Sequence, residues 1–104
     1  MFARVVTLHG QPNKLHDGIR AWEERISTVE FLKGFDNVYL LTDRKTGKFM
    51  VVSLWDSEGD LNASNNTIIP IRDAVSTAIG ASDQPILEVY EVSRERGRRM
   101  RKAA

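Results

Sequence analysis

Residues 49–60 read FMVVSLWDSEGD and contain the strand and the helix start from which the fold can be worked out. A strand with one wet face alternates apolar with polar residues, but along this strand both alternating sets are apolar. The two sets are Phe49, Val51 and Trp55 on one side and Met50, Val52 and Leu54 on the other. Ser57, with Asp60 three positions on, has the spacing of a capping box, which predicts that a helix begins there.

Upstream of this stretch the sequence predicts two more strands and a helix. Residues 38–42 form a strand that pairs with residues 49–55 through a charged turn containing glycine. Residues 2–9 form another strand, rich in β-branched residues. Between them apolar residues recur every three or four positions, which predicts an amphipathic helix that begins at Asn13 as N-cap and ends at Gly34. Its apolar stripe consists of Leu15, Ile19, Trp22, Ile26 and Val29.

Downstream of Ser57 the pattern predicts a helical region and a last strand. Pro70 interrupts the helical region, so we expect either a kink or two short helices that meet near Asn65 and Asn66. The strand follows over residues 86–92. The order strand, helix, strand, strand, helix, strand predicts an α+β domain of the ferredoxin-like β-α-β-β-α-β type. Such a domain has a four-stranded antiparallel sheet with both helices on one face.

Length, composition and charge limit the classes of function. The 104 residues fit one domain, which we assign to residues 1–93, followed by a basic, flexible tail at residues 94–104. No aromatic residue interleaves with the arginines of the tail, so nucleic acid is not an expected partner. The absence of cysteine excludes a disulfide framework, a thiolate metal site and a cysteine nucleophile.

Targeting and metal motifs are also missing from the sequence. There is no signal peptide and no apolar run near the roughly 18 residues of a membrane span, so we expect a cytoplasmic protein with no membrane partner. There is no Gly-rich phosphate loop, no Gly-x-Ser-x-Gly elbow and no cluster at metal-ligand spacing. We therefore expect no metal site.

The predicted sheet has more apolar surface than its helices can cover. Two helices pack on one face, and the other face would expose about seven large apolar side chains, at about 1.5–3 kcal/mol each for full burial. The forgone stabilisation, on the order of 10–20 kcal/mol, rivals the total stability of a domain. A second copy packed sheet against sheet is the simplest cover, so we expect a homodimer. A large apolar ligand and a different partner protein are the alternatives.

Several short motifs occur in an order that is typical of one family. They are Gly34-Phe35, Val38–Thr42, Leu54-Trp55-Asp56-Ser57-Glu58, Leu61-Asn62-Ala63-Ser64 and Glu88-Val89-Tyr90-Glu91-Val92. In these motifs, residues 2–93 resemble the antibiotic-biosynthesis monooxygenase-like family of dimeric α+β barrel proteins. The resemblance implies a barrel of two four-stranded sheets, one from each subunit, with a cavity between sheet and helices. Its members include oxygenases that oxidise polycyclic phenols or quinols with no metal or flavin, and others that degrade haem.

The haem-degrading branch is not matched residue by residue. Those enzymes resemble one another in an Asn on the first strand, a Trp in the helix after the third strand and a His further along. In this chain Arg4, Ser64 and Ala74 stand near those places, and both histidines, His9 and His16, lie at the other end of the chain. The resemblance therefore implies oxygenation without a cofactor here rather than haem degradation.

Cofactor-free oxygenation needs a group that removes a phenolic proton, donors that stabilise the anion, and apolar walls that exclude water. The candidate catalytic residues are His9, Tyr39, Trp55 and Tyr90. The candidate substrate-binding residues are Arg4, Trp22, Phe49, Asn62 and Arg72. Most of them have a structural alternative: a solvated His9, tryptophans that are core, tyrosines whose hydroxyls are satisfied, an Asn62 that faces water, and an arginine paired with an acid such as Glu88. His16 lies off the apolar stripe and is expected at the surface.

The sequence thus predicts a monooxygenase that needs no cofactor and acts on an aromatic or quinone-like small molecule. The alternative is a non-enzymatic small-ligand-binding or stress-associated dimeric module on the same fold. A purely structural interaction domain is a third reading. An enclosed cavity of about 300 Å³ or more between helices and sheet favours the first two readings, and a solid core favours the third.

Overall fold

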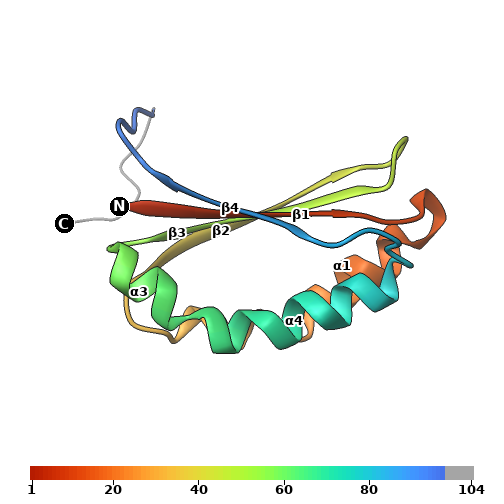
Figure 1. The fold of residues 1–104 in the computed structure, drawn as a ribbon, viewed down its shortest axis with the longest axis horizontal. Coiled ribbons are helices and arrows are strands. Elements are labelled where there is room, and N and C mark those ends of the chain that lie inside the picture. The colour runs from red at the N-terminus through yellow and green to blue at the C-terminus, as the bar shows by residue number, and fades with distance from the viewer. Residues whose placement is uncertain (98–104) are drawn as a thin grey trace.

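One antiparallel sheet of four strands forms a layer of the molecule, as the computed structural model shows for residues 1–97, the part of the chain that it describes (Figure 1). The strands are β1 (Phe2–His9), β2 (Phe35–Asp43), β3 (Lys48–Trp55) and β4 (Ile86–Glu91), in the spatial order β2-β3-β1-β4. Each pair is antiparallel. This topology confirms the predicted ferredoxin-like α+β fold. The larger part of the predicted basic tail, residues 98–104, lies outside the described residues.

The helices lie together on one face of this sheet (Figure 1). They are α1 (Leu15–Glu23), α2 (Ser27–Glu30), α3 (Glu58–Ala63) and α4 (Asn65–Ala78), and a 3-10 turn η1 (Pro12–Lys14) precedes α1. No helix of residues 1–97 combines the length and the apolar character that crossing a membrane requires.

The first helical region differs from the prediction in its start and its continuity. Asn13 is not the N-cap, because it lies inside η1. Pro12 occupies the first position of this turn, where the fixed φ of proline is favourable. The chain also leaves the helix after Glu23, and a turn separates α1 from α2. At this turn the Thr28 hydroxyl donates to the Arg25 carbonyl at 2.9 Å, so a side chain competes with the helical hydrogen bonds.

The second helical region begins and breaks where the sequence predicts, but Pro70 does not interrupt α4. The Ser57 hydroxyl accepts from the backbone N–H of Asp60 at 3.1 Å and caps α3 as the capping-box spacing predicts. Ser64 separates α3 from α4, next to the predicted meeting point. Pro70 lies inside α4, where its missing N–H would have faced the carbonyl of Asn66 in the first turn of that helix.

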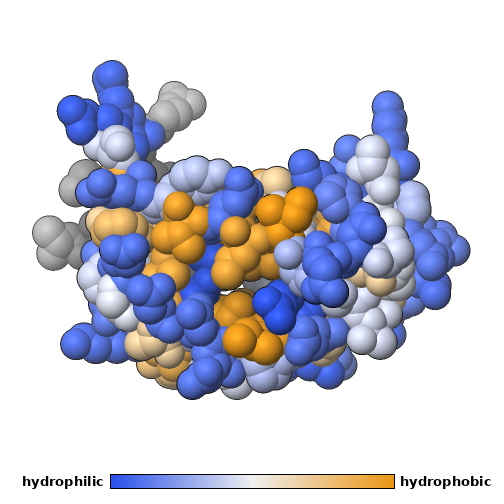
Figure 2. All heavy atoms as spheres, viewed as in Figure 1, coloured by the Kyte–Doolittle hydropathy of each residue, from blue (hydrophilic) through white to orange (hydrophobic). Residues whose placement is uncertain are grey.

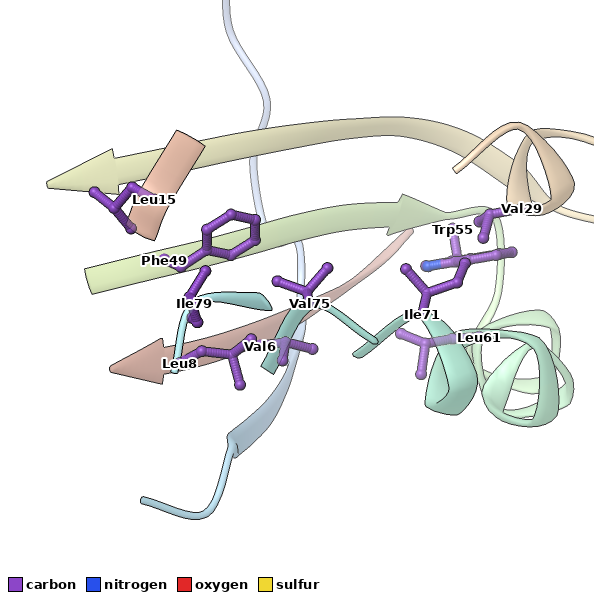
Figure 3. Close-up of a cluster of buried hydrophobic side chains, with 10 residues drawn as sticks. All are labelled: Val6, Leu8, Leu15, Val29, Phe49, Trp55, Leu61, Ile71, Val75 and Ile79. Carbon is purple, nitrogen blue, oxygen red and sulfur yellow. The ribbon is translucent and has the colours of Figure 1, made fainter. Parts of the chain in front are cut away.

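The register of the sheet decides which residues meet the helices. Arg4 lies opposite Ser53, Val6 opposite Val51 and Leu8 opposite Phe49. These residues face the helix layer, where the main core forms (Figure 3). Its buried side chains are Val6, Leu8, Leu15, Val29, Phe49, Trp55, Leu61, Ile71, Val75 and Ile79.

The other face of the sheet carries no helix of residues 1–97 (Figure 1). We call it the open face and define it by Val5, Tyr39, Leu41, Met50, Val52, Leu54, Ile86 and Tyr90, which are half-buried or exposed. The edge strand β4 adds exposed Leu87 and Val89, whose side chains alternate with those of the open face. In Figure 2, apolar side chains gather around a hollow between β4 and α4. The sheet therefore has apolar side chains on both faces, as the sequence predicts.

Candidate functional site

A pocket lies between the helices and the sheet and draws its walls from both layers. We call it the inner pocket. Its lining residues are Arg4, Val6, Leu8, Trp22, Ile26, Val29, Val38, Phe49, Val51, Ser53, Ile68, Ile71, Arg72 and Val75. The space within it is about 40 Å³, enough for about one to three water molecules. Pockets for drug-sized ligands have roughly 300–1,000 Å³, so the inner pocket is smaller than the volume that favours an enzyme or a binder over an interaction domain. An aromatic ligand would need the helices to move apart.

Arg4 is the most buried charged residue of this pocket. It lies in the middle of β1, and only 2% of its surface is exposed. Its Nη2 donates to the Leu61 carbonyl at 2.6 Å, the Ser64 hydroxyl at 2.9 Å and the Asn65 side-chain oxygen at 2.5 Å. All three acceptors belong to the junction of α3 and α4. Nη1 is buried as well and makes no hydrogen bond.

Within residues 1–97, the charge of Arg4 therefore has no carboxylate partner. Burial lowers the pKa of its guanidinium, because the charged form loses contact with water. The guanidinium carbon lies 5.8 Å from the ring centre of Trp55, within the range of a cation–π contact. The indole N–H of Trp55 donates to the Ser53 hydroxyl at 3.0 Å. Trp55 is thus fully buried core with its donor already used.

The predicted ion pair of an arginine with Glu88 is wrong. Glu88 pairs with Val5 across the strands and therefore points away from the helices, whereas Arg4 points toward them. The Glu88 carboxylate accepts from the Tyr90 hydroxyl at 2.6 Å, and this hydrogen bond raises the pKa of Tyr90. Arg72 pairs with its neighbour Asp73 at 3.4 Å, near the surface.

The structure brings together only part of the predicted site. Four of the five predicted substrate-binding residues line the inner pocket: Arg4, Trp22, Phe49 and Arg72. Asn62 is exposed on α3. His9 is exposed at the end of β1, and Tyr39 and Tyr90 lie on the open face, so none of these three candidates for catalysis reaches the inner pocket. The described part of the chain thus offers no histidine or tyrosine to the pocket.

Two residues of the site escaped the sequence analysis. Ser53 stands opposite Arg4 and lines the inner pocket, and Asn65 accepts from Arg4. For Ser53 there was a signal, because it is the one polar residue within the apolar run of β3. For Asn65 there was none, since its role depends on where α3 ends.

A second hollow of about 280 Å³ lies outside the core, between the start of α1 and the end of β2. It includes His16, Thr42 and Arg44, all of which are exposed. Although its volume is larger, its polar groups are already solvated, so it offers a ligand little burial. The inner pocket is therefore the better candidate site.

The inner pocket does not fit haem. Arg4 and Ser64, which stand near the places of the Asn and Trp shared by haem degraders, are hydrogen-bonded to each other at 2.9 Å. Within residues 1–97, no group of three or more His, Cys, Asp or Glu side chains could hold a metal ion.

Sequence comparisons identify relatives. Residues 1–69 match the model of the family described as antibiotic biosynthesis monooxygenase. The uncharacterised proteins Rv2557 and Rv2558 of Mycobacterium tuberculosis are 29% identical over 96 residues and 28% identical over 83 residues, which cover 89% and 79% of this chain. The chain spans only 41% and 35% of the lengths of these curated relatives.

Solved structures share the fold at low sequence identity. A Nitrosomonas europaea protein of unknown function matches with a TM-score of 0.74 and 16% identity over 93% of each chain. The haem degrader MhuD of Mycobacterium tuberculosis, with two haems bound in its active site, matches with a TM-score of 0.73 and 19% identity, over 93% of this chain and 100% of that chain. At such identities the likeness shows the common fold.

Proposed function

Because this chain belongs to the antibiotic biosynthesis monooxygenase family, we propose that its inner pocket binds a small aromatic or quinol-type molecule and oxidises it with molecular oxygen. For an anthrone-type phenol, the ring CH₂ of the keto form becomes a carbonyl, one atom of O₂ enters the product, and the other leaves as water with the two hydrogens. No metal or flavin takes part. The observation that carries the proposal is the gathering of Arg4, Trp22, Phe49 and Arg72 around one pocket.

The pocket supplies the walls that such a reaction needs. Its lining is mainly aliphatic and aromatic, which excludes water and keeps a reactive substrate anion from side reactions. A ligand of this size can enter only if the helix layer moves away from the sheet, because the pocket now has a volume of about 40 Å³. The turn between α1 and α2 and the junction at Ser64 are the places where this layer is interrupted. We expect the helices to part there and close over the ligand.

We further propose that the subunit pairs with a second copy through the open face. The apolar side chains of that face have no cover from the described residues of one subunit. A two-fold pairing of sheet on sheet buries the same residues on both copies. The inner pocket lies on the other side of the sheet, so pairing leaves it accessible from the helix layer.

The oxidation is tested by oxygen uptake with an anthrone-type phenol. Ile68 lines the inner pocket from α4, whereas its neighbour Ile69 does not line it and is exposed. Ile68→Trp fills the pocket and is expected to reduce uptake at least tenfold, and Ile69→Trp is the matched control that keeps it. Similar uptake by both variants would place the reaction elsewhere.

A non-enzymatic ligand-binding module is the second candidate function. The observation in its favour is that no histidine or tyrosine of residues 1–97 lines the inner pocket to remove a substrate proton. The two functions separate in the same experiment. If the phenol binds to the native protein and to Ile69→Trp but oxygen is not consumed, the protein is a binder.

A further inference from the structure

The buried end of Arg4 offers a hydrogen-bond donor that the protein leaves unused. Nη1 is inaccessible to solvent and has no partner, although Nη2 of the same group makes three hydrogen bonds. More than nine in ten buried polar groups in proteins have a partner, so each exception calls for a physical reason. Arg4 lines the inner pocket, so a ligand that enters when the helix layer opens comes within reach of this donor.

The charge of the group argues for more than a water molecule. The partners of Nη2 are a carbonyl, a hydroxyl and an amide oxygen, all of them neutral. The end of α3 contributes a partial negative charge at Leu61, but this falls short of a full counter-charge. A buried charge without a partner is costly. Water would satisfy the hydrogen bond of Nη1, whereas an anion would also satisfy the charge.

The other polar residues of the lining, Ser53 and Arg72, also carry donors. Ser53 accepts the indole N–H of Trp55, which leaves its own O–H free to donate. Arg72 is half-buried and forms a salt bridge of 3.4 Å with the exposed carboxylate of Asp73. No acidic side chain from the described part of the chain lines the inner pocket. A ligand that matches this lining carries acceptors, and its best position for a negative charge is beside Arg4.

We propose that the inner pocket selects aromatic acids, with the ligand carboxylate bound to Nη1 of Arg4 and the ring among the apolar residues of the lining. Charge-assisted bonds of guanidinium with carboxylate are short and strong, and their geometry orients the ring. This rests on the proposed function only in taking the inner pocket as the ligand site. It adds the chemical class of the ligand and the residue that recognises it.

The test compares naphthoate with naphthylmethanol, which keeps the ring but carries no charge. Calorimetry on the native chain is expected to give a dissociation constant at least tenfold lower for the acid. Ile68→Trp should abolish binding of both probes, and Ile69→Trp should leave both unchanged. Equal affinity for acid and alcohol would contradict the selection of acids but would still support the inner pocket as the ligand site. Binding of neither probe would overturn both the assignment and the pocket.

The role of Arg4 is tested by Arg4→Met, with Arg20→Met as the control, since Arg20 is exposed on α1. Arg4→Met should remove the preference for the acid but keep binding of the alcohol, and Arg20→Met should preserve both. A folded Arg4→Met that still prefers the acid would contradict the proposal. Should Arg4→Met fail to fold, the ratio of the two native dissociation constants decides the matter.

Discussion

At the scale of single residues, Trp55 anchors the polar end of the core. Its ring meets Phe35 edge to face, with centroids 5.6 Å apart and planes at 80°, and lies beneath the guanidinium of Arg4. Its indole N–H has a partner in Ser53. The Trp55 ring is buried and its N–H is hydrogen-bonded, so the ring is held in place. The guanidinium of Arg4 packs against it beside the inner pocket.

The hydrogen bond of Ser53 gives a prediction for stability. Ser53→Ala leaves the N–H of Trp55 buried without an acceptor, so the free energy of unfolding should fall by roughly 1–3 kcal/mol. Ser82→Ala, in the exposed loop before β4, should change it by less than about 0.5 kcal/mol. Urea denaturation measures both. An equal effect of the two substitutions would show that the hydrogen bond between Ser53 and Trp55 does not contribute to the free energy of unfolding.

Which residues meet Arg4 could not be predicted from the sequence. A buried arginine favours an acid as partner, and Glu88 stands in the last strand, yet it faces the other side of the sheet. The true acceptors lie 57 to 61 positions away and depend on the residue at which α3 ends. Helix ends are set by local competition between side chains and backbone, which a periodic pattern does not reveal.

At the scale of elements, α1 packs close against the loop after α4 because of Gly18. A Cβ at Gly18 would overlap Cγ2 of Ile79 and come within 3.2 Å of the Phe49 ring. Gly59, in α3, has open space around it, with the nearest atom at 3.8 Å. Both glycines lie in helices, but only Gly18 is closely packed. Substituting each of them therefore distinguishes the effect of packing from the effect of helix propensity.

Alanine at these two positions should have opposite effects. Gly18→Ala should lower the free energy of unfolding by about 1–3 kcal/mol, because the close approach to Ile79 and Phe49 is lost. Gly59→Ala should leave it unchanged or raise it by up to about 1 kcal/mol, because alanine favours the helix. Thermal unfolding followed by circular dichroism compares them. A gain in stability for Gly18→Ala would refute the close packing.

The elements themselves were largely predictable. All four strands and their antiparallel order follow from apolar runs and turn residues, and the capping box at Ser57 locates the start of α3. The interruption between α1 and α2 was missed, because the apolar stripe continues through Ile26 and Val29. Hydrophobic periodicity indicates which side of a helix is buried. It does not reveal a turn when the residues on both sides of that turn bury the same face.

At the scale of the whole molecule, the open face is the feature that one subunit cannot account for. Leu41 is 51% exposed there, although it lies in a strand of the sheet. Phe31 is 88% exposed but belongs to the helix layer, directly after α2. Predicting an uncovered apolar face needed only the two apolar sets of each strand. The inner pocket was harder to predict, because its lining comes from β1, α1, α2, the turn between these two helices, β2, β3 and α4, which only the fold brings together.

Pairing through the open face is tested most directly by the mass in solution. Sedimentation equilibrium at micromolar concentration should give twice the 11.8 kDa mass of the chain. Leu41→Lys should shift the equilibrium toward the single chain, because it places charges on both copies of the paired face, and Phe31→Lys should keep the doubled mass. A native chain that sediments at 11.8 kDa throughout this range would contradict the account.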